Sequence, residues 1–166
     1  MIPDIQLIQM GGTIDKKYPQ RQGAYAFEIE EASAPSLLKE MRLPFNIQSI
    51  SIAQKDSQDL TEEDRQNLKN YIENSDCTRF IVTHGTDTMI ETGKYISDLK
   101  NVVVILTGSF MPASCLESDA SAQLGASVMA SQLVDPGVYV CMSGQIIPAR
   151  EAIRHNETGT FGYAKS

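Results

Sequence analysis

Hydroxyl, amide and carboxylate side chains gather at the ends of four short apolar runs of the sequence. The densest cluster is His84-Gly85-Thr86-Asp87-Thr88, which stops the run RFIVT abruptly. A hydroxyl beside a carboxylate could attack a carbonyl or bind a small polar ligand, but the same residues could simply cap a helix. Three further clusters have a similar composition: Gly11-Gly12-Thr13, Asp56-Ser57-Gln58-Asp59 and Thr107-Gly108-Ser109.

Each cluster has an ordinary structural explanation when it is taken alone. Thr86 or Asp87 can serve as the N-cap of the helix that follows. The segment 56–59 fits a solvated turn, and Gly11-Gly12 resembles half of a dinucleotide-binding turn whose third glycine is missing. Taken together, however, the clusters occupy the positions where ligands bind in an open α/β sheet, beyond the carboxyl ends of the strands. We therefore expect the four clusters to meet in one crevice.

The elements that must position these clusters alternate between apolar runs and helical patterns. Five runs are apolar at most positions, which is typical of strands covered on both faces: 5–9, 47–53, 79–83, 102–107 and 137–142. The segments between the last four of these apolar runs have helical periodicity, with Thr61 and Ser118-Asp119 as start signals. A short earlier helix is expected over about 36–41. This order predicts a single-domain, three-layer α/β/α fold with a mainly parallel sheet of the Rossmann or flavodoxin type.

Two segments do not fit the alternation. Residues 15–33 are polar and contain Pro19 and Gly23, which favours a mobile loop over a packed element. The segment after Gly144 has no pattern that assigns it to a helix or a strand.

Composition and charge exclude several classes of function. The chain has 166 residues, enough for one domain, with 42% hydrophobic and 21% charged residues as in globular proteins. Fourteen Lys and Arg against 21 Asp and Glu give a net charge of −7, which argues against nucleic acid or a membrane as a partner. The N-terminus has no signal-peptide pattern and no segment approaches the roughly 18 apolar residues that span a bilayer, so we expect a cytoplasmic protein. The spacing of Cys77, Cys115 and Cys141 indicates free thiols, and we expect neither a metal site nor a cofactor.

Read as longer motifs, the same clusters carry a resemblance to a known family. QMGGTID over 9–15, DSQDL over 56–60, THGTDTMIETGKYI over 83–96 and LTGSFMP over 106–112 resemble successive signatures of the bacterial-type L-asparaginases, which are threonine amidohydrolases. GGTI followed by HGTDT at this distance is far more specific than either motif alone. The resemblance covers essentially the whole chain, but only the N-terminal catalytic domain of a family whose members usually continue into a smaller second domain. It therefore implies a short-chain form in which residues 1–166 are the catalytic domain and about 15–33 are a mobile lid.

The resemblance implies catalytic roles for four residues. Thr13 matches the nucleophile that attacks the side-chain amide and forms an acyl-enzyme, which water then hydrolyses. A lid tyrosine helps to activate that nucleophile; Tyr25 matches it by context, and Tyr18 is the competing candidate. Thr86 and Asp87 would orient the substrate and the attacking water, and Asp87 would also pair with the substrate α-ammonium group. The family chemistry does not use a residue at the position of His84, which is more simply a structural residue than a base.

The remaining candidates bind substrate: Gly12, Ser57, Gln58, Gly85 and Ser109. Ser57 and Gln58 match the residues that hold the substrate α-carboxylate and α-amino groups. Backbone N–H groups near the two glycines and Thr86 are expected donors to an oxyanion or a carboxylate.

Two features depart from the family pattern. The family places a lysine beside the second threonine and the aspartate, and aligning IIPAREAIRHN with that segment puts Arg154 in its place. Arginine keeps its proton up to a pKa of about 12 or more, so Arg154 can anchor Asp87 but cannot act as a base. The family's second domain also donates a carboxylate to the lid tyrosine across a subunit interface. Glu28 or Glu30 would have to replace it, or activation of the nucleophile is weaker, so we expect modest activity. Because the family site is built between two subunits, we also expect a homo-oligomer, either a dimer or a tetramer.

Three functions from different classes are compatible with these residues. The leading one is hydrolysis of L-asparagine to L-aspartate and ammonia, with L-glutamine as a further substrate. The alternative is a non-catalytic amino-acid-binding module that has lost turnover. The third, a nucleotide-binding α/β domain, is disfavoured because the Gly-rich phosphate turn is missing. Ammonia release from asparagine separates the first function from the second.

Overall fold

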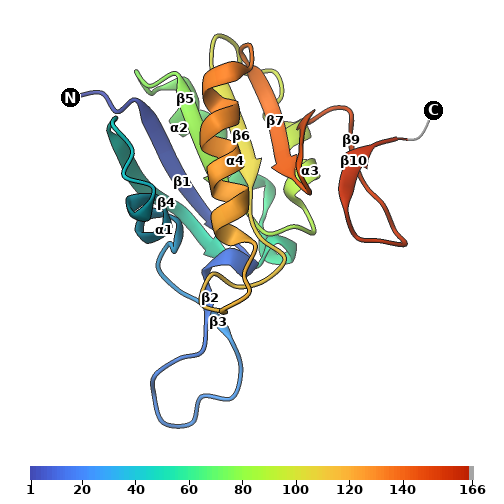
Figure 1. Ribbon diagram of the computed structural model, residues 1–166. Coiled ribbons are helices and arrows are strands. Elements are labelled where there is room, and N and C mark those ends of the chain that lie inside the picture. The colour runs from blue at the N-terminus through green and yellow to red at the C-terminus, as the bar shows by residue number, and fades with distance from the viewer. Residues whose placement is uncertain (165–166) are drawn as a thin grey trace.

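The computed structural model describes residues 1–164 and contains a central sheet flanked by helices (Figure 1). Its strands are β1 (Ile5–Gly11), β2 (Lys16–Lys17), β3 (Glu28–Ile29), β4 (Ile47–Lys55), β5 (Arg79–Thr83), β6 (Val103–Thr107), β7 (Gly137–Met142), β8 (Gln145–Pro148), β9 (Ala152–Arg154) and β10 (Phe161–Tyr163). Its α-helices are α1 (Ala34–Glu40), α2 (Glu62–Glu73), α3 (Met89–Tyr95) and α4 (Ala120–Leu133). Two short 3-10 helices are η1 (Thr13–Asp15) and η2 (Ser57–Asp59).

Six strands form the main sheet in the order β4-β1-β5-β6-β7-β8. The first five are parallel, and β8 runs antiparallel to β7. Numbered along the chain, the five parallel strands have the order 2-1-3-4-5 of a flavodoxin-like sheet, in which ligands bind where the strand order reverses, between strands 1 and 3. The predicted mainly parallel sheet is therefore confirmed, and the position where such a fold binds ligands lies between the carboxyl ends of β1 and β5.

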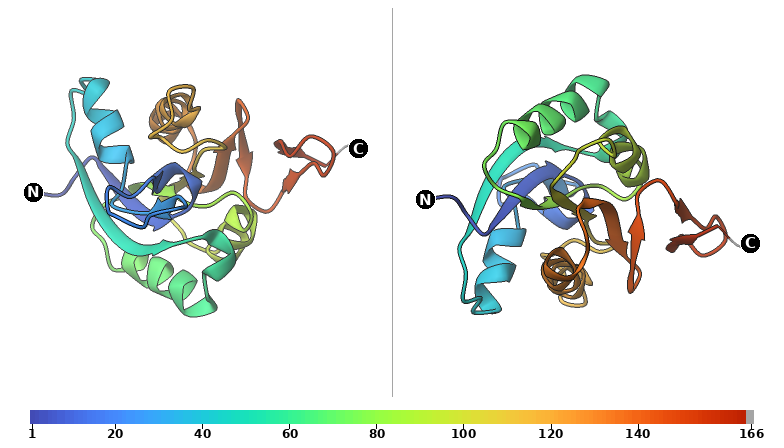
Figure 2. Two further views of the ribbon diagram at one scale, coloured as in Figure 1. Left: turned by 90° about the horizontal axis from the view of Figure 1, so that it is seen from below. Right: turned by 90° about the horizontal axis from the view of Figure 1, so that it is seen from above.

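Helices cover both faces of the sheet and give the predicted three layers. Side chains alternate along β1, so Ile5 and Leu7 join the apolar cluster formed with α1 and α4, whereas Ile8 and Met10 join the cluster formed with α2 and α3. Figure 2 shows α1 and α4 on one side of the twisted sheet and α2 and α3 on the other. Because both faces are covered, the central strands are apolar at nearly every position, as the sequence pattern indicated.

The helices begin where local side chains satisfy their first N–H groups. The Thr61 hydroxyl accepts a hydrogen bond from the Asp64 N–H, and the Asp64 carboxylate accepts one from the Thr61 N–H, which forms a capping box at the start of α2. The helix expected over 36–41 begins two residues earlier, at Ala34, with Pro35 in its first turn. Within residues 1–164, none of the helices combines the length and apolar character needed to cross a membrane.

The segment 15–33 is more ordered at its ends than the sequence predicted. Lys16 and Lys17 pair with Ile29 and Glu28 as the antiparallel strands β2 and β3. Asp15 is fully buried just before this ladder, although its charge suggested the start of an exposed loop. The loop between the two strands projects away from the body of the molecule in Figure 1. The part of the chain expected to be mobile is therefore shorter than the full segment 15–33.

The segment that the sequence left unassigned continues the sheet and then leaves it. The positive φ angles of Ser143 and Gly144 turn the chain back, so that β8 pairs with β7. Beyond β8 the chain forms the separate hairpin β9-β10, in which Phe161 pairs with Arg154. Figure 1 shows this hairpin at the edge of the sheet beyond β7, and β10 contacts β8.

Candidate active site

Close contacts at three glycines bring the four clusters together. A Cβ on Gly12 would lie 2.3 Å from the Gly85 nitrogen, and a Cβ on Gly85 would lie 2.7 Å from the Ser57 Oγ. A Cβ on Gly108 would lie 2.3 Å from the carbonyl oxygen of His84. Real side chains do not reach such separations, so the loops after β1, β4, β5 and β6 can meet only where these residues are glycine. The convergence expected from the sequence is thus present in the structure.

Thr13 stands at the end of β1, directly after two glycines in unusual conformations. Gly11 and Gly12 have φ angles of 106° and 91°, and the Gly12 N–H donates to the Lys55 carbonyl at 3.0 Å. Thr13 is half-buried and begins η1. The glycines therefore turn the chain sharply enough to place Thr13 beside the segment that follows β5.

Buried polar contacts fix the residues that follow Thr13. The Asp15 carboxylate accepts hydrogen bonds from the Ser33 N–H at 2.8 Å and from the Gln9 amide at 2.9 Å. Burial raises the pKa of the Asp15 carboxyl, and these hydrogen bonds offset only part of the rise. The Gln9 amide also donates to the Glu30 carbonyl at 2.9 Å. Both ends of the expected lid are therefore tied to β1.

Ser57 and Thr88 connect the loop after β4 with the loop after β5. Ser57 is 2% exposed, and its carbonyl accepts a hydrogen bond from the Thr88 hydroxyl at 2.7 Å. The preceding Asp56 accepts hydrogen bonds from the Gln58 N–H and from Lys16, the latter at 3.1 Å. Burial acts to raise the pKa of Asp56, but these bonds outweigh it and leave the pKa below its ordinary value. The loop thus presents Ser57 and Gln58 from a fixed backbone.

Asp87 joins two other residues that the sequence singled out. Its Oδ2 accepts a hydrogen bond from the Gln58 Nε2 at 2.7 Å, and its Oδ1 accepts one from the Arg154 Nη1 at 2.8 Å. The Asp87 side chain is 46% exposed, so it remains accessible to a ligand from outside. Gln58, Asp87 and Arg154 therefore form one hydrogen-bonded group at the mouth of the crevice.

The sequence did not indicate the residues that hold Arg154 in place. Its Nε donates to the Gly159 carbonyl at 2.9 Å, and its guanidinium lies 6.0 Å from the ring centre of Phe110 and 5.6 Å from that of Phe161. Both rings are within the range of cation–π attraction. The FGY run that contains Phe161 lies in the tail without a clear pattern, which is why the contact was not anticipated.

Ser109 is held within its own loop. It is 1% exposed, and its hydroxyl donates to the Met111 carbonyl. The N–H groups of Phe110 and Met111 donate to the Asp119 carboxylate at 3.0 to 3.1 Å. Burial acts to raise the pKa of Asp119, but these bonds outweigh it and lower the pKa. Asp119, which the sequence indicated as a helix-start residue, thus also fixes the loop that carries Ser109.

Neither candidate lid tyrosine is packed against the crevice. Tyr25 is 93% exposed, so its hydroxyl does not contact the half-buried Thr13. Tyr18 is 54% exposed, and its hydroxyl donates to the Ala24 carbonyl at 2.8 Å. Of the two candidate acids, Glu28 forms an ion pair with Arg21, which lowers the pKa of Glu28. The structure therefore shows the loop in a conformation that leaves Thr13 uncovered by either tyrosine.

His84 lies fully buried behind the crevice. Burial lowers its pKa to about 4, and the nearby positive charge of Arg65 acts in the same direction. One ring nitrogen lies 2.7 Å from the Gly85 carbonyl oxygen and the other lies 2.8 Å from the Thr92 hydroxyl. With both nitrogens occupied inside the protein, His84 is unavailable as a base for a bound ligand, in line with the structural role expected for it.

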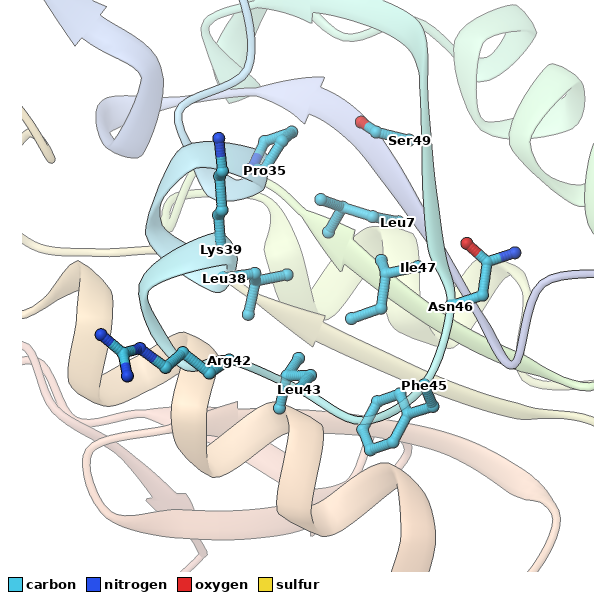
Figure 3. A pocket seen from close by; sticks show the side chains of 10 residues that line it. All are labelled: Leu7, Pro35, Leu38, Lys39, Arg42, Leu43, Phe45, Asn46, Ile47 and Ser49. Atoms are coloured by element: carbon cyan, nitrogen blue, oxygen red, sulfur yellow. The ribbon is translucent and has the colours of Figure 1, made fainter.

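A hollow of about 370 Å³ lies elsewhere, between α1 and the edge of the sheet (Figure 3). Leu7, Leu38, Leu43 and Ile47 contribute apolar side chains to it. It faces the amino-terminal half of β4, whereas the polar clusters follow the carboxyl ends of the strands. The hollow is therefore separate from the crevice in which the four polar clusters meet.

Comparison with protein families agrees with the motifs. The model described as "Asparaginase, N-terminal" matches residues 4–164. A protein named "Probable L-asparaginase periplasmic" from Haemophilus influenzae is 31% identical over 169 residues, covering 95% of this chain and 48% of the relative. The protein named "L-asparaginase 2" from Escherichia coli is 27% identical over 171 residues, covering 95% of this chain and 48% of the relative. The chain thus spans about half the length of these relatives.

Solved structures match the fold over nearly the whole chain. The thermostable L-asparaginase from Thermococcus kodakarensis superposes with a TM-score of 0.81 at 23% identity, covering 96% of this chain and 50% of that one. L-asparaginase I from Vibrio cholerae gives a TM-score of 0.80 at 23% identity, covering 99% of this chain and 51% of that one. At these identities the likeness establishes the fold.

Proposed function

Because the chain belongs to the asparaginase family through its match to the N-terminal family model over residues 4–164, we propose that it hydrolyses L-asparagine to L-aspartate and ammonia. L-Glutamine is the expected weaker substrate, since it carries the same amide one methylene further from the α-carbon. No cofactor or metal is required, because a hydroxyl nucleophile and hydrogen-bond donors suffice for amide hydrolysis.

In the proposed reaction Thr13 is the nucleophile. Its Oγ forms a bond to the amide carbon while the carbonyl π electrons move to the oxygen. The lid tyrosine accepts the Thr13 proton and passes its own proton to the amide nitrogen, so the C–N bond breaks and ammonia leaves. Water then attacks the acyl-enzyme by the same relay in reverse, which releases aspartate and restores the Thr13 hydroxyl. Because Tyr25 is 93% exposed, this step requires the loop to close over the crevice.

The contact between Gly12 and Gly85 carries the proposal. It sets the GGT segment against the HGTDT segment, so the nucleophile and Thr86 flank a single junction. The group of Gln58, Asp87 and Arg154 supplies donors and a carboxylate at the mouth of the same crevice. A zwitterionic amino acid matches this arrangement, with its ammonium group on Asp87 and its carboxylate near Ser57 and Gln58.

Ammonia release from L-asparagine and L-glutamine tests the proposal. Purified protein is compared with Thr13→Ala, Thr86→Ala and the control Thr158→Ala, which removes an exposed hydroxyl from the β9-β10 hairpin. Loss of a nucleophile or of a group in the same unit lowers kcat by at least about a hundredfold. Release that disappears in the first two variants and persists in the control supports the enzyme.

A binding module without turnover is the alternative, and Arg154 favours it. An arginine cannot cycle its proton as the lysine of the family pattern does. Aspartate binding by calorimetry decides between the two functions when ammonia release is absent. Binding that is lost in Asp87→Asn, without any release by the parent protein, supports the module and rejects the enzyme.

We also propose that the protein is a homo-oligomer, a dimer or a tetramer. Phe110, Met111 and Leu116 are exposed by 40%, 46% and 101% on the loop that also carries Ser109. A second copy could cover these apolar side chains beside the crevice. Light scattering coupled to size exclusion measures the mass, and a monomer at working concentration rejects this proposal.

A further inference from the structure

Three buried polar side chains form a hydrogen-bonded chain behind the crevice. The Arg65 Nε donates to the Thr92 hydroxyl oxygen at 2.9 Å. The Thr92 Oγ1 lies 2.8 Å from the His84 Nε2, and the His84 Nδ1 lies 2.7 Å from the Gly85 carbonyl oxygen. Arg65 is 6% exposed, and both His84 and Thr92 are fully buried. The chain therefore runs from α2 through α3 to the backbone after β5.

The partners fix the position of the proton on His84. A carbonyl oxygen only accepts hydrogen bonds, so the Nδ1 must carry the proton and donate to Gly85. Burial keeps the ring neutral with a pKa of about 4, so the Nε2 is an acceptor for the Thr92 hydroxyl. The Thr92 hydroxyl oxygen accepts a hydrogen bond from Arg65, so the proton of the Thr92 hydroxyl is free to be donated to His84. One tautomer satisfies every member of the chain.

The chain determines which way the Gly85–Thr86 peptide faces. Within residues 1–164 there are no cis peptide bonds, so the Gly85 carbonyl and the Thr86 N–H point in opposite directions. His84 draws the carbonyl into the core, and the Thr86 N–H is consequently aimed outwards, where Thr86 is half-buried. That N–H has no acceptor within the described part of the chain. It is therefore available to an oxygen atom bound in the crevice.

We propose that His84 is a positioning residue, which holds the Gly85–Thr86 peptide so that the Thr86 N–H donates to the oxygen on the carbon attacked by Thr13. This inference rests on the proposed function. As the Thr13 oxygen bonds to that carbon, the carbonyl π electrons become a lone pair on the oxygen, which is the charge that the N–H stabilises. A donor fixed in advance is more effective than one that must reorient, because it needs no rearrangement as the charge develops.

Replacing His84 by asparagine or by glutamine tests the roles of its two ring nitrogens separately. In His84→Asn the amide nitrogen replaces Nδ1, so the donor to Gly85 is retained and the partner of Thr92 is lost. In His84→Gln the longer side chain replaces Nε2, so the contact with Thr92 is retained and Gly85 loses its donor. We expect kcat for asparagine to fall about a hundredfold in His84→Gln, with a change in KM of less than about threefold, and to fall less than about tenfold in His84→Asn.

A second pair of variants guards against misfolding of His84→Gln. Thr92→Ser keeps the hydroxyl that fixes the ring, whereas Thr92→Val removes it and frees His84 to change its tautomer. We expect kcat to stay within about threefold in Thr92→Ser and to fall about tenfold in Thr92→Val, each measured on protein shown to be folded by circular dichroism. Equal kcat values in His84→Asn and His84→Gln, or in the two Thr92 variants, would overturn the positioning role.

Backbone NMR keeps this test distinct from the test of the proposed function. Absence of ammonia release by the parent protein counts against the enzyme, and the role of His84 is then read from the Thr86 amide resonance in an aspartate titration. We expect that resonance to shift in the parent protein and in Thr92→Ser, and not in Thr92→Val. A shift of equal size in both Thr92 variants, or no shift in the parent protein, rejects the inference.

Discussion

Gly12 and Gly85 meet backbone to backbone, with only 2.3 Å between the position of a Cβ on Gly12 and the Gly85 nitrogen. The two residues come from the ends of β1 and β5, which are neighbours in the sheet, and each is followed directly by a threonine. The contact therefore fixes the distance between the segments that carry Thr13 and Thr86. A Cβ on Gly85 would in turn meet the Ser57 side chain, so the GGT, DSQ and HGT segments constrain one another at this junction.

The first prediction concerns this contact. Gly12→Ala combines a positive φ with a steric clash, so we expect a loss of more than about 3 kcal/mol in the free energy of unfolding and loss of ammonia release. Gly144→Ala is the matched control, because Gly144 has a φ of 72° and nothing within 4 Å of a Cβ. The control should lose only about 1 to 2 kcal/mol and remain active. Equal urea midpoints for the two variants would show that backbone strain, and not the contact, dominates.

The central sheet was predictable because its strands are covered on both faces. Runs such as RFIVT and VVVILT are apolar at nearly every position, and that pattern identifies buried parallel strands without any knowledge of their neighbours. The polar clusters were predictable for a related reason, since loops at the carboxyl ends of parallel strands share one edge of the sheet. Local pattern and topology together were enough to bring Gly12, Ser57 and Gly85 to one place.

Contacts between distant segments were not predictable from pattern. The β8 to β10 strands contain three or four residues each, too few to show a period. Arg154 was connected with Asp87 only through the family resemblance, since 67 residues separate them. The chain from Arg65 to His84 gave no signal at all, because single polar residues on three elements are indistinguishable from surface residues until the fold buries them. Asp15 was misjudged for the same reason.

The second prediction follows from the buried neutral state of His84. Its pKa is about 4 in the folded protein, so between pH 6.5 and 4 the unfolded chain binds a proton that the folded protein does not. His84 therefore contributes stability at pH 7 that is lost as the pH falls, by roughly 3 kcal/mol in all.

The stability difference between parent protein and His84→Asn measures this contribution. It should narrow by roughly 3 kcal/mol between pH 7 and pH 4 in urea titrations. A constant difference for His84→Asn across this range would mean that the ring takes up its proton in the folded protein as readily as in the unfolded chain.

The third prediction concerns the charge on Asp87. Asp87→Asn keeps an oxygen that can accept from Arg154 but loses the charge proposed to pair with the substrate ammonium group. A hydrogen bond to a charged group contributes about 1.5 to 3 kcal/mol, so we expect KM for asparagine to rise about tenfold to a hundredfold. Because the side chain is 46% exposed, the free energy of unfolding should change by less than about 1 kcal/mol.

Asp59→Asn is the control for net charge, since Asp59 is an exposed acid in η2, close to Ser57 in sequence. Its KM should stay within about twofold of the parent value, because screening weakens the effect of exposed charges that do not touch the ligand. Similar KM values in both variants would assign the effect to overall charge and remove Asp87 from substrate binding.

The fourth prediction distinguishes the two lid tyrosines. Tyr25 is 93% exposed and its hydroxyl is free to move with the loop, whereas the Tyr18 hydroxyl donates to Ala24 and helps to shape the loop itself. If loop closure brings Tyr25 onto Thr13, Tyr25→Phe removes the proton relay and should lower kcat by about a hundredfold or more with little change in stability. Tyr18→Phe loses only an exposed hydrogen bond and should retain most of kcat.

Closure itself is measurable as slower trypsin cleavage after Arg21 when aspartate is added, since a loop packed on the crevice is a poorer protease substrate. The reverse order of kcat values, with Tyr18→Phe the more damaged, would transfer the relay to Tyr18 and require the loop to rearrange before it closes.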